Sequence, residues 1–153
     1  MQDFVHLHVH TQYSLLDGQA SVARLVDKTM QNGMKGIAVT DHGNMFGIKE
    51  FTNYVNKKNS GPKGEVKDLK KRIAGIEAGT IECADKEAEI AACKAKIVEA
   101  ENKLFKPVIG CEMYVARRTM DLKEGKPDQS GYHLIVLAKN EKGYHNLIKL
   151  VSH

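Results

Sequence analysis

Residues 5–18 read VHLHVHTQYSLLDG, and the alternation at the start of this stretch predicts a β-strand. His6, His8 and His10 occupy every second position among apolar residues, so a strand would send all three imidazoles to one face. Neighbouring imidazoles on that face can converge on one metal ion. The alternative is a row of hydrogen-bonded structural histidines. For His6, furthest from the C-terminal end of the strand, a structural role is equally favoured.

The composition is that of an ordinary globular domain. The chain has 153 residues, of which 42% are hydrophobic and 27% charged. It contains no apolar run near the roughly 20 residues that span a bilayer, and no signal peptide, so we expect a cytoplasmic protein without a membrane partner. Its three cysteines lack C-x-x-C spacing, which argues against a disulfide framework or a zinc knuckle. The net charge of +4 says little about nucleic acid.

A loop and a helix are predicted after the first strand. Residues 11–18 form the loop, which returns Asp17 towards the histidines. Ser21 is expected to cap the helix, whose apolar residues recur at spacings of three and four, and Gly33 suits a left-handed position just past its end. One face of this helix is therefore expected to pack on the strands.

A second strand is predicted at residues 36–40. Its residues are continuously apolar, as expected for a parallel strand that is covered on both faces. This strand delivers Asp41 and His42 at its C-terminal end, where parallel α/β folds place reactive side chains. A helix over residues 45–57 is expected to follow.

The composition changes between residues 58 and 104. Apolar residues keep a heptad-like spacing over 66–76 and again over 90–104, with lysine and glutamate elsewhere and a break near Gly79. This pattern predicts an antiparallel helical hairpin over residues 58–104, inserted into a domain that comprises residues 1–57 and 105–153. Two interpretations stay open, a solvated spacer and a surface for a partner.

Two further strands are predicted downstream of the hairpin. Residues 108–116 alternate, so that Glu112 lies on one face of a strand and Cys111 on the other. A carboxylate in a strand that packs needs a metal ion, a cation or hydrogen bonds. A second apolar strand, over residues 132–138, brings His133 in at its start.

Four motifs occur in a specific order: VHLHVHTQYSLLDG, AVTDHGNMFG, KPVIGCEMYV and YHLIVLAKNEKGYHNLIKLVS. Together they resemble the polymerase and histidinol phosphatase (PHP) family, in the branch found at the N-terminus of bacterial replicative DNA polymerase III alpha subunits. The resemblance covers nearly all of the chain except residues 58–104, which look like a lineage-specific addition. It implies an α/β fold, the N-terminal part of a distorted (β/α)7 TIM-like barrel, with up to three metal ions at the strand C-terminal ends.

The resemblance also implies a set of metal ligands and the role of a neighbouring carboxylate. Carried over residue by residue, the ligands would be His8, His10, Asp17, His42, Glu112 and His133. Asp41 would orient an imidazole or a water molecule. These donor types suit divalent zinc, manganese or iron.

The family supplies further ligands, a cysteine or histidine and an Asp-x-His pair, from strands that would lie beyond residue 153. The last predicted helix, capped by Asn140, has no terminating glycine, asparagine or proline, which predicts that the sequence continues. We therefore expect a PHP domain truncated at its C-terminus, with incomplete metal sites and open strand edges through which the piece self-associates.

Three functions follow from the resemblance. The first is metal-dependent phosphoester hydrolysis, as a 3′-to-5′ exonuclease that meets DNA through the full-length polymerase. The second is a catalytically silent module that docks the polymerase core or a separate proofreading exonuclease subunit. The third is a small-molecule PHP phosphatase, against which TQYSLLDG and TDHGNMFG favour the polymerase branch. Nucleotide polymerisation itself would reside outside this chain.

Overall fold

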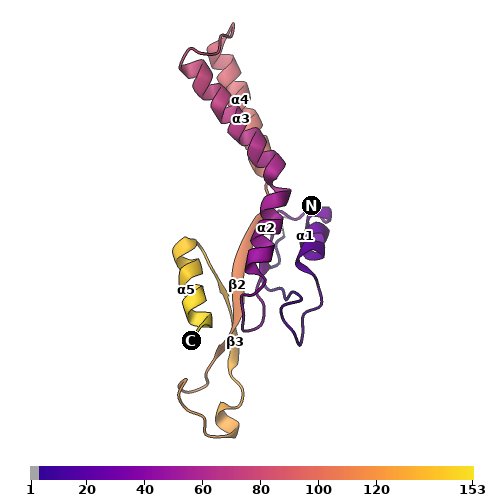
Figure 1. Cartoon of the computed structure of the whole chain (residues 1–153), viewed down its shortest axis with the longest axis vertical. Helices are drawn as coiled ribbons and strands as arrows, with labels where there is room; N and C mark the ends of the chain where they lie inside the picture. Colours follow the sequence, from indigo (N-terminus) through magenta and orange to yellow (C-terminus); the bar gives the residue numbers. More distant parts are fainter. Residues whose placement is uncertain (1–3) are drawn as a thin grey trace. The chain divides into compact units, whose positions relative to one another are not determined.

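The computed structural model describes residues 4–153, which divide into two compact units (Figure 1). The first unit comprises Met1–Tyr54 and Lys106–His153, and the second comprises Val55–Phe105. Helices and strands both contribute to the first unit, whereas the second is helical. The α/β class predicted from the sequence is therefore confirmed.

The first unit contains a small mixed sheet. Its strands are β1 (Gly36–Val39), β2 (Lys106–Val115) and β3 (Tyr132–Leu137), in the order β1-β2-β3. β1 runs parallel to β2, and β3 runs antiparallel to it. Every residue of β1 is buried, as its continuous apolar sequence predicts. Among the described residues the sheet stays open, so a complete barrel is not formed by this part of the chain.

Two helices flank the sheet, α1 (Val22–Gln31) and α5 (Glu141–Val151). Ser21 and Asn140 cap them, each accepting a hydrogen bond from a backbone N–H in the first turn. Gly33, just past the end of α1, has a φ of 74°, a conformation that glycine adopts without steric penalty. These three boundaries agree with the sequence-based prediction.

The second unit is built around a helical hairpin. α2 (Ile48–Lys58) leads into α3 (Ser60–Glu77), and α4 (Lys86–Asn102) returns beside it (Figure 1). The turn contains Gly79 with a φ of 74°. α3 starts earlier than the apolar spacing indicates. Pro62 lies in its first turn, where proline is tolerated because backbone N–H groups there have no hydrogen-bond partner within the helix.

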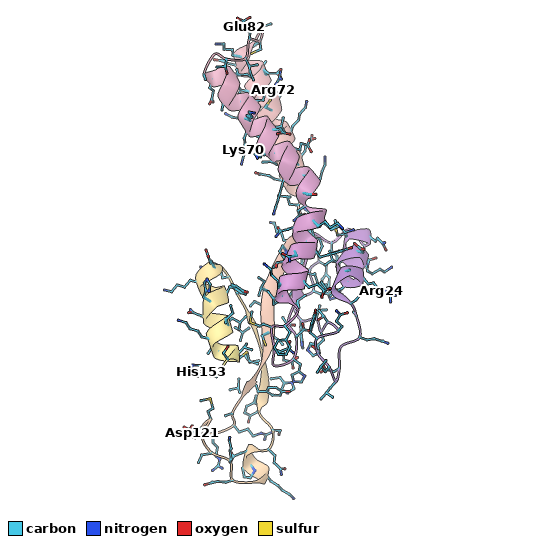
Figure 2. All side chains as sticks on the ribbon, in the orientation of Figure 1. Arg24, Lys70, Arg72, Glu82, Asp121 and His153 are labelled. Atoms are coloured by element: carbon cyan, nitrogen blue, oxygen red, sulfur yellow. The ribbon has the colours of Figure 1, made fainter. Side chains whose placement is uncertain are left out.

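Polar contacts tie the two helices of the hairpin together. Near its tip, Arg72 Nη2 lies 2.8 Å from Glu89 Oε1; Figure 2 labels Arg72 beside Lys70 on α3. At its base, the buried Asn59 amide donates to the carbonyl of Phe105 at 2.8 Å and accepts from the backbone N–H of the same residue at 2.9 Å. The chain therefore enters and leaves the hairpin at one hydrogen-bonded point.

The loop between β2 and β3 is ordered by a charged network. It includes a short 3-10 helix, η1 (Lys126–Asp128). Arg118 donates to both Glu124 and Asp128, and the backbone N–H of Glu124 also donates to the Asp128 carboxylate. Paired charges thus give the connection between β2 and β3 a defined course.

The first predicted strand is wrong in detail. The histidine-rich segment runs extended beside β1, with Ala38 N donating to His6 O at 2.8 Å and Thr40 N donating to Val9 O at 2.9 Å. Three steps along the segment therefore match two steps along β1, and a bend at Leu7 takes up the extra residue. A regular ladder cannot form across this mismatch, so the segment is not a strand.

The bend also separates His6 from the other two histidines. Its ring meets the edge of the Phe4 ring at a centroid distance of 4.8 Å. His8 and His10, which follow the bend, remain close to each other, with Nε2 atoms 3.2 Å apart. The expectation that three imidazoles share one face therefore fails for His6 and holds for the other pair.

Candidate metal centre

Glu112 on β2 stands at the centre of a cluster of histidines. Its side chain is only 5% exposed. Oε2 lies 2.8 Å from His8 Nε2 and 2.5 Å from His10 Nε2, while Oε1 lies 2.5 Å from His133 Nδ1. Oε2 thus faces His8 and His10, which precede Glu112 by more than a hundred residues in the sequence. Oε1 faces His133, which lies on the neighbouring strand β3.

The strand geometry explains the position of Glu112. Beyond the end of β1, the backbone N–H of Glu112 donates to Asp41 O at 3.1 Å, and Gly43 N donates to Glu112 O at 2.8 Å. These bonds extend the parallel pairing past the last residue of β1 and bring His42 next to Glu112. On the other side, Tyr114 pairs with His133 in the antiparallel register, which places His133 on the same face as Glu112.

Thr40 fixes the segment that carries His8 and His10. Its hydroxyl accepts a hydrogen bond from Val9 N at 2.9 Å, and its own backbone N–H donates to Val9 O. The residue between the two histidines is thereby held on both of its backbone groups. With Val9 fixed in this way, the imidazoles on either side of it reach the same carboxylate oxygen.

Asp17 joins the cluster from the loop, as predicted. Its Oδ2 accepts a hydrogen bond from His42 Nδ1 at 3.0 Å, and its Oδ1 lies 3.2 Å from His10 Nδ1. The structure therefore brings together all six predicted ligands within the first unit, whereas His6 lies outside the cluster.

Asp41 has a different set of partners from the predicted one. Its buried carboxylate accepts hydrogen bonds from Thr11 N at 2.6 Å, from Thr11 Oγ1 at 2.9 Å and from Ser14 Oγ at 2.7 Å. Ser14 Oγ in turn accepts the backbone N–H of His42 at 3.1 Å. Asp41 therefore orders the loop that carries Asp17, and none of these three hydrogen bonds comes from an imidazole.

Both carboxylates of the cluster are in the ionised form that binds cations. Burial raises the pKa of Glu112, but hydrogen bonds from His8 and His10 outweigh it and bring the pKa to about 2. A hydrogen bond from His42 lowers the pKa of Asp17 below its usual value. At neutral pH the cluster therefore contains two negative charges among its imidazoles.

The side chains fit a divalent metal ion. Three groups of three donors each have their ligand atoms within 4.8 Å of one another; they are His8/His10/Glu112, His10/Asp17/His42 and His42/Glu112/His133. The buried Nε2 atom of His42 has no hydrogen-bond partner among the described residues, and such an atom is costly unless something binds it. Three protein donors also leave coordination positions open, as in catalytic sites.

The spacing of the first group supports this fit. The donor atoms of His8, His10 and Glu112 form a triangle with sides of 3.2, 2.8 and 2.5 Å. Ligands that each lie about 2.1 Å from one ion would be separated by roughly 3 to 3.4 Å. Small outward movements of the side chains would therefore accommodate an ion between them.

The sequence-based prediction missed the contact between Tyr114 and the cluster. The Tyr114 ring stacks on His42 with centroids 4.8 Å apart and meets the edge of His133 at 5.2 Å. Its position two residues after Glu112, on the same face of a strand, was the signal that could have revealed it. Thr11 and Ser14 were missed as well, because their role depends on the buried Asp41.

Two comparisons with known proteins found relatives of this chain. A family model described as the PHP domain matches residues 6–97 and 91–153. The chain is 39% identical over 152 residues to DNA polymerase III subunit alpha of Borreliella burgdorferi, which covers 97% of this chain and 9% of the relative. It is 38% identical over 150 residues to the same subunit of Treponema pallidum, with the same coverage.

A third relative has a lower sequence identity and covers the same share of the chain. DNA polymerase III subunit alpha of Aquifex aeolicus is 32% identical over 155 residues, which is 97% of this chain and 10% of the relative. The similar part of these relatives is their N-terminal region. The chain thus spans about a tenth of the length of the curated relatives it matches.

Proposed function

Because the chain belongs to the PHP domain family, as its four motifs predicted, we propose that its six clustered side chains bind divalent metal ions and hydrolyse phosphodiesters at nucleic-acid 3′ ends. The observation that carries this proposal is the position of Glu112. Its two oxygens face separate histidine groups, and the adjacent His42 Nε2 has no partner among residues 4–153. Such an arrangement suits a carboxylate that bridges two ions.

The number of ions follows from the donors. A neutral imidazole has one lone pair, so His10 and His42 can each serve one ion at a time. The groups His8/His10/Glu112 and His42/Glu112/His133 can be filled together, since they share only the carboxylate. The group that contains Asp17 draws on the same two histidines. We therefore expect two ion sites that can be occupied together and a third that competes with them for His10 and His42.

The side chains have distinct roles in this proposal. Neighbouring divalent ions would supply Lewis acidity for the phosphate and an activated water. Glu112 keeps its negative charge at neutral pH and is the donor that the two histidine groups share. Asp17 orients the His42 ring through Nδ1, which leaves Nε2 facing the site. Zinc, manganese and iron all suit this donor set.

We further propose that the chain acts within a DNA polymerase III alpha subunit, as the first part of a TIM-like barrel. The similarity over 97% of the chain to such subunits supports this context, and DNA replication is then the process served. DNA, the polymerase core and a proofreading exonuclease subunit are the partners proposed for the whole protein. Polymerisation of nucleotides is assigned to other regions of the subunit.

The proposal is tested by metal content and primer degradation. The chain, and an alpha subunit that carries it, are dialysed against metal-free buffer, analysed for bound metal, and incubated with a 3′-labelled primer. His8→Ala should remove about one ion and lower the degradation rate by at least roughly ten-fold, the range of effects seen when metal sites are weakened. His6→Ala, in the same segment but outside the cluster, is the matched control and should change neither.

Two results would contradict the proposal in different ways. Metal retention equal in the His8→Ala and His6→Ala proteins would exclude the cluster as the metal site. Full metal loading without primer degradation, in both the chain and the subunit, would exclude the nuclease and leave the silent docking module as the function.

The hairpin of residues 58–104 is proposed as an accessory module of the domain. One observation supports a separate role: the hairpin lies in its own compact unit. None of the proposed ligands lies within it. A surface for another component of the replication machinery is the role we propose for this hairpin.

A further inference from the structure

Tyr114 is an aromatic side chain that is both firmly held and exposed. One part of its ring stacks on His42 at 4.8 Å, another contacts His133 at 5.2 Å, and the Cβ of any residue replacing Gly43 would lie 3.0 Å from Tyr114 Cε2. The side chain is nevertheless 60% exposed. Three neighbours therefore fix the orientation of a ring whose remaining surface is open.

Glycine is needed beside the ring. Gly43 has a φ of 68°, and it also lacks the Cβ that would press on Tyr114. The turn after β1 thus allows the ring to lie directly over the backbone next to His42. This close approach positions the tyrosine at the edge of the candidate metal centre, two residues from Glu112.

A groove continues from Tyr114 onto the β2–β3 loop. It has a volume of about 250 Å³, and its lining includes Arg117 and Lys123. The acidic side chain in the lining, Asp128, is paired with Arg118. Arg117 is itself fixed, because its Nε donates to Ser130 O at 2.8 Å. The groove therefore presents positive charge next to an aromatic surface.

We propose that Tyr114 stacks on the terminal nucleobase of a single-stranded nucleic acid whose last phosphodiester lies at the metal centre. This inference rests on the proposed function and names the substrate of that site. Bases stack on exposed aromatic rings with little sequence preference, and positive side chains follow the backbone in such sites. Arg117 and Lys123 would contact the phosphates of the preceding nucleotides.

Fluorescence of a base analogue tests the stacking. The probe is a single-stranded tetranucleotide with 2-aminopurine at the 3′ end and a terminal phosphorothioate linkage, bound to the chain in Mn²⁺. A second probe has an abasic 3′ end. Tyr114→Leu should weaken binding of the first probe by roughly five-fold to a hundred-fold, the range for loss of one stacked base, and leave the second nearly unchanged. Tyr114→Phe should restore binding and quenching.

Phe4→Leu provides the matched control. Phe4 is a similarly exposed aromatic residue, 55% exposed, and its ring contacts His6, which lies outside the metal cluster. Its replacement should affect neither probe. Metal content is measured for each variant. If Tyr114→Leu disturbs His42, which its ring contacts, the variant will contain less metal, and this effect can be distinguished from the loss of stacking.

A measurement on the unmodified protein covers the case in which Tyr114→Leu does not fold. Nuclear Overhauser effects between the Tyr114 ring protons and a terminal adenine are expected, and their absence in a bound complex would overturn the proposal. Equal weakening of both probes, or no binding of either by the metal-loaded chain, would also overturn it. Base-specific binding without hydrolysis would refute the nuclease and leave the stacking intact. Hydrolysis at an unchanged rate in the Tyr114→Leu protein would refute the stacking and leave the nuclease intact.

Discussion

Because of Glu112, we expect the free energy of unfolding of the metal-free chain to depend on pH in the acidic range. Its pKa is about 2 in the folded chain, against 4.5 for an ordinary glutamate. A lowered pKa means that the ionised carboxylate stabilises the fold above pH 4.5, and that this contribution disappears as the pH falls from about 4.5 to about 2. At roughly 1.4 kcal/mol per pKa unit, up to about 3 kcal/mol is involved.

Urea unfolding at pH 7 and pH 3, in the presence of a chelator, measures this contribution. The unmodified chain should lose free energy of unfolding between the two pH values, and Glu112→Gln should lose clearly less. Parallel losses in the two proteins would mean that Glu112 gains nothing from His8 and His10.

At the same scale, residue types indicated which side chains would cluster but not which residues support them. His8, His10 and Glu112 could be predicted from alternation, because a strand face needs no tertiary information. The partners of Asp41 could not, since hydrogen bonds from Thr11 and Ser14 depend on a loop folding back over the end of β1. His6 was misplaced because a bend of one residue is invisible in a periodic pattern.

Among the elements, the loop of residues 11–18 depends most on one buried group. Asp41 accepts three hydrogen bonds from it, and Asp41→Asn turns an amide NH₂ towards groups that need an acceptor. Each unsatisfied buried donor costs about 1–3 kcal/mol, so we expect a destabilisation of roughly 2–4 kcal/mol and weaker metal binding. Denaturant unfolding and metal analysis provide the measurement.

The exposed Asp68 on α3 offers a control of the same chemical type. Asp68→Asn should change the free energy of unfolding by less than about 0.5 kcal/mol, as is usual for surface substitutions. If Asp41→Asn behaved like this control, the loop would be held by other contacts.

The other elements differ in how well their sequence predicted them. α1 and α5 were found with their caps, and β1, β2 and β3 were found within a residue or two, because their signals are local. The start of α3 was missed by six residues, since Gly61 and Gly64 look like loop residues. The sequence pattern could not predict whether the sheet closes into a barrel, because closure depends on contacts between strands that are distant in the sequence.

For the whole molecule, the hairpin and the metal centre are expected to be separable. Ser60–Leu104 can be replaced by a short Gly/Ser linker that keeps Asn59 and Phe105, the pair that closes the base of the hairpin. Because no proposed ligand is removed, metal content should stay the same, and binding to another replication component should weaken. Loss of metal would show that the hairpin supports the site.

A point substitution separates the two effects. Asn59→Ala in the intact chain leaves the backbone groups of Phe105 buried without partners, which should destabilise the second unit by about 1–3 kcal/mol while metal content stays the same. A fall in metal content here would argue that the two units are energetically coupled.

The bend at Leu7 constrains how the chain can vary over evolution. The Leu7 side chain is 52% exposed, so many residue types should serve equally well there. Removing the position altogether would give a one-to-one match with β1 that keeps both backbone hydrogen bonds, so His8 and His10 would keep their face. A deletion between Val9, which is paired with Thr40, and His10 would instead turn His10 to the other face. Substitutions and single-residue deletions at position 7 should therefore both occur among functional relatives, whereas deletions after Val9 should be selected against.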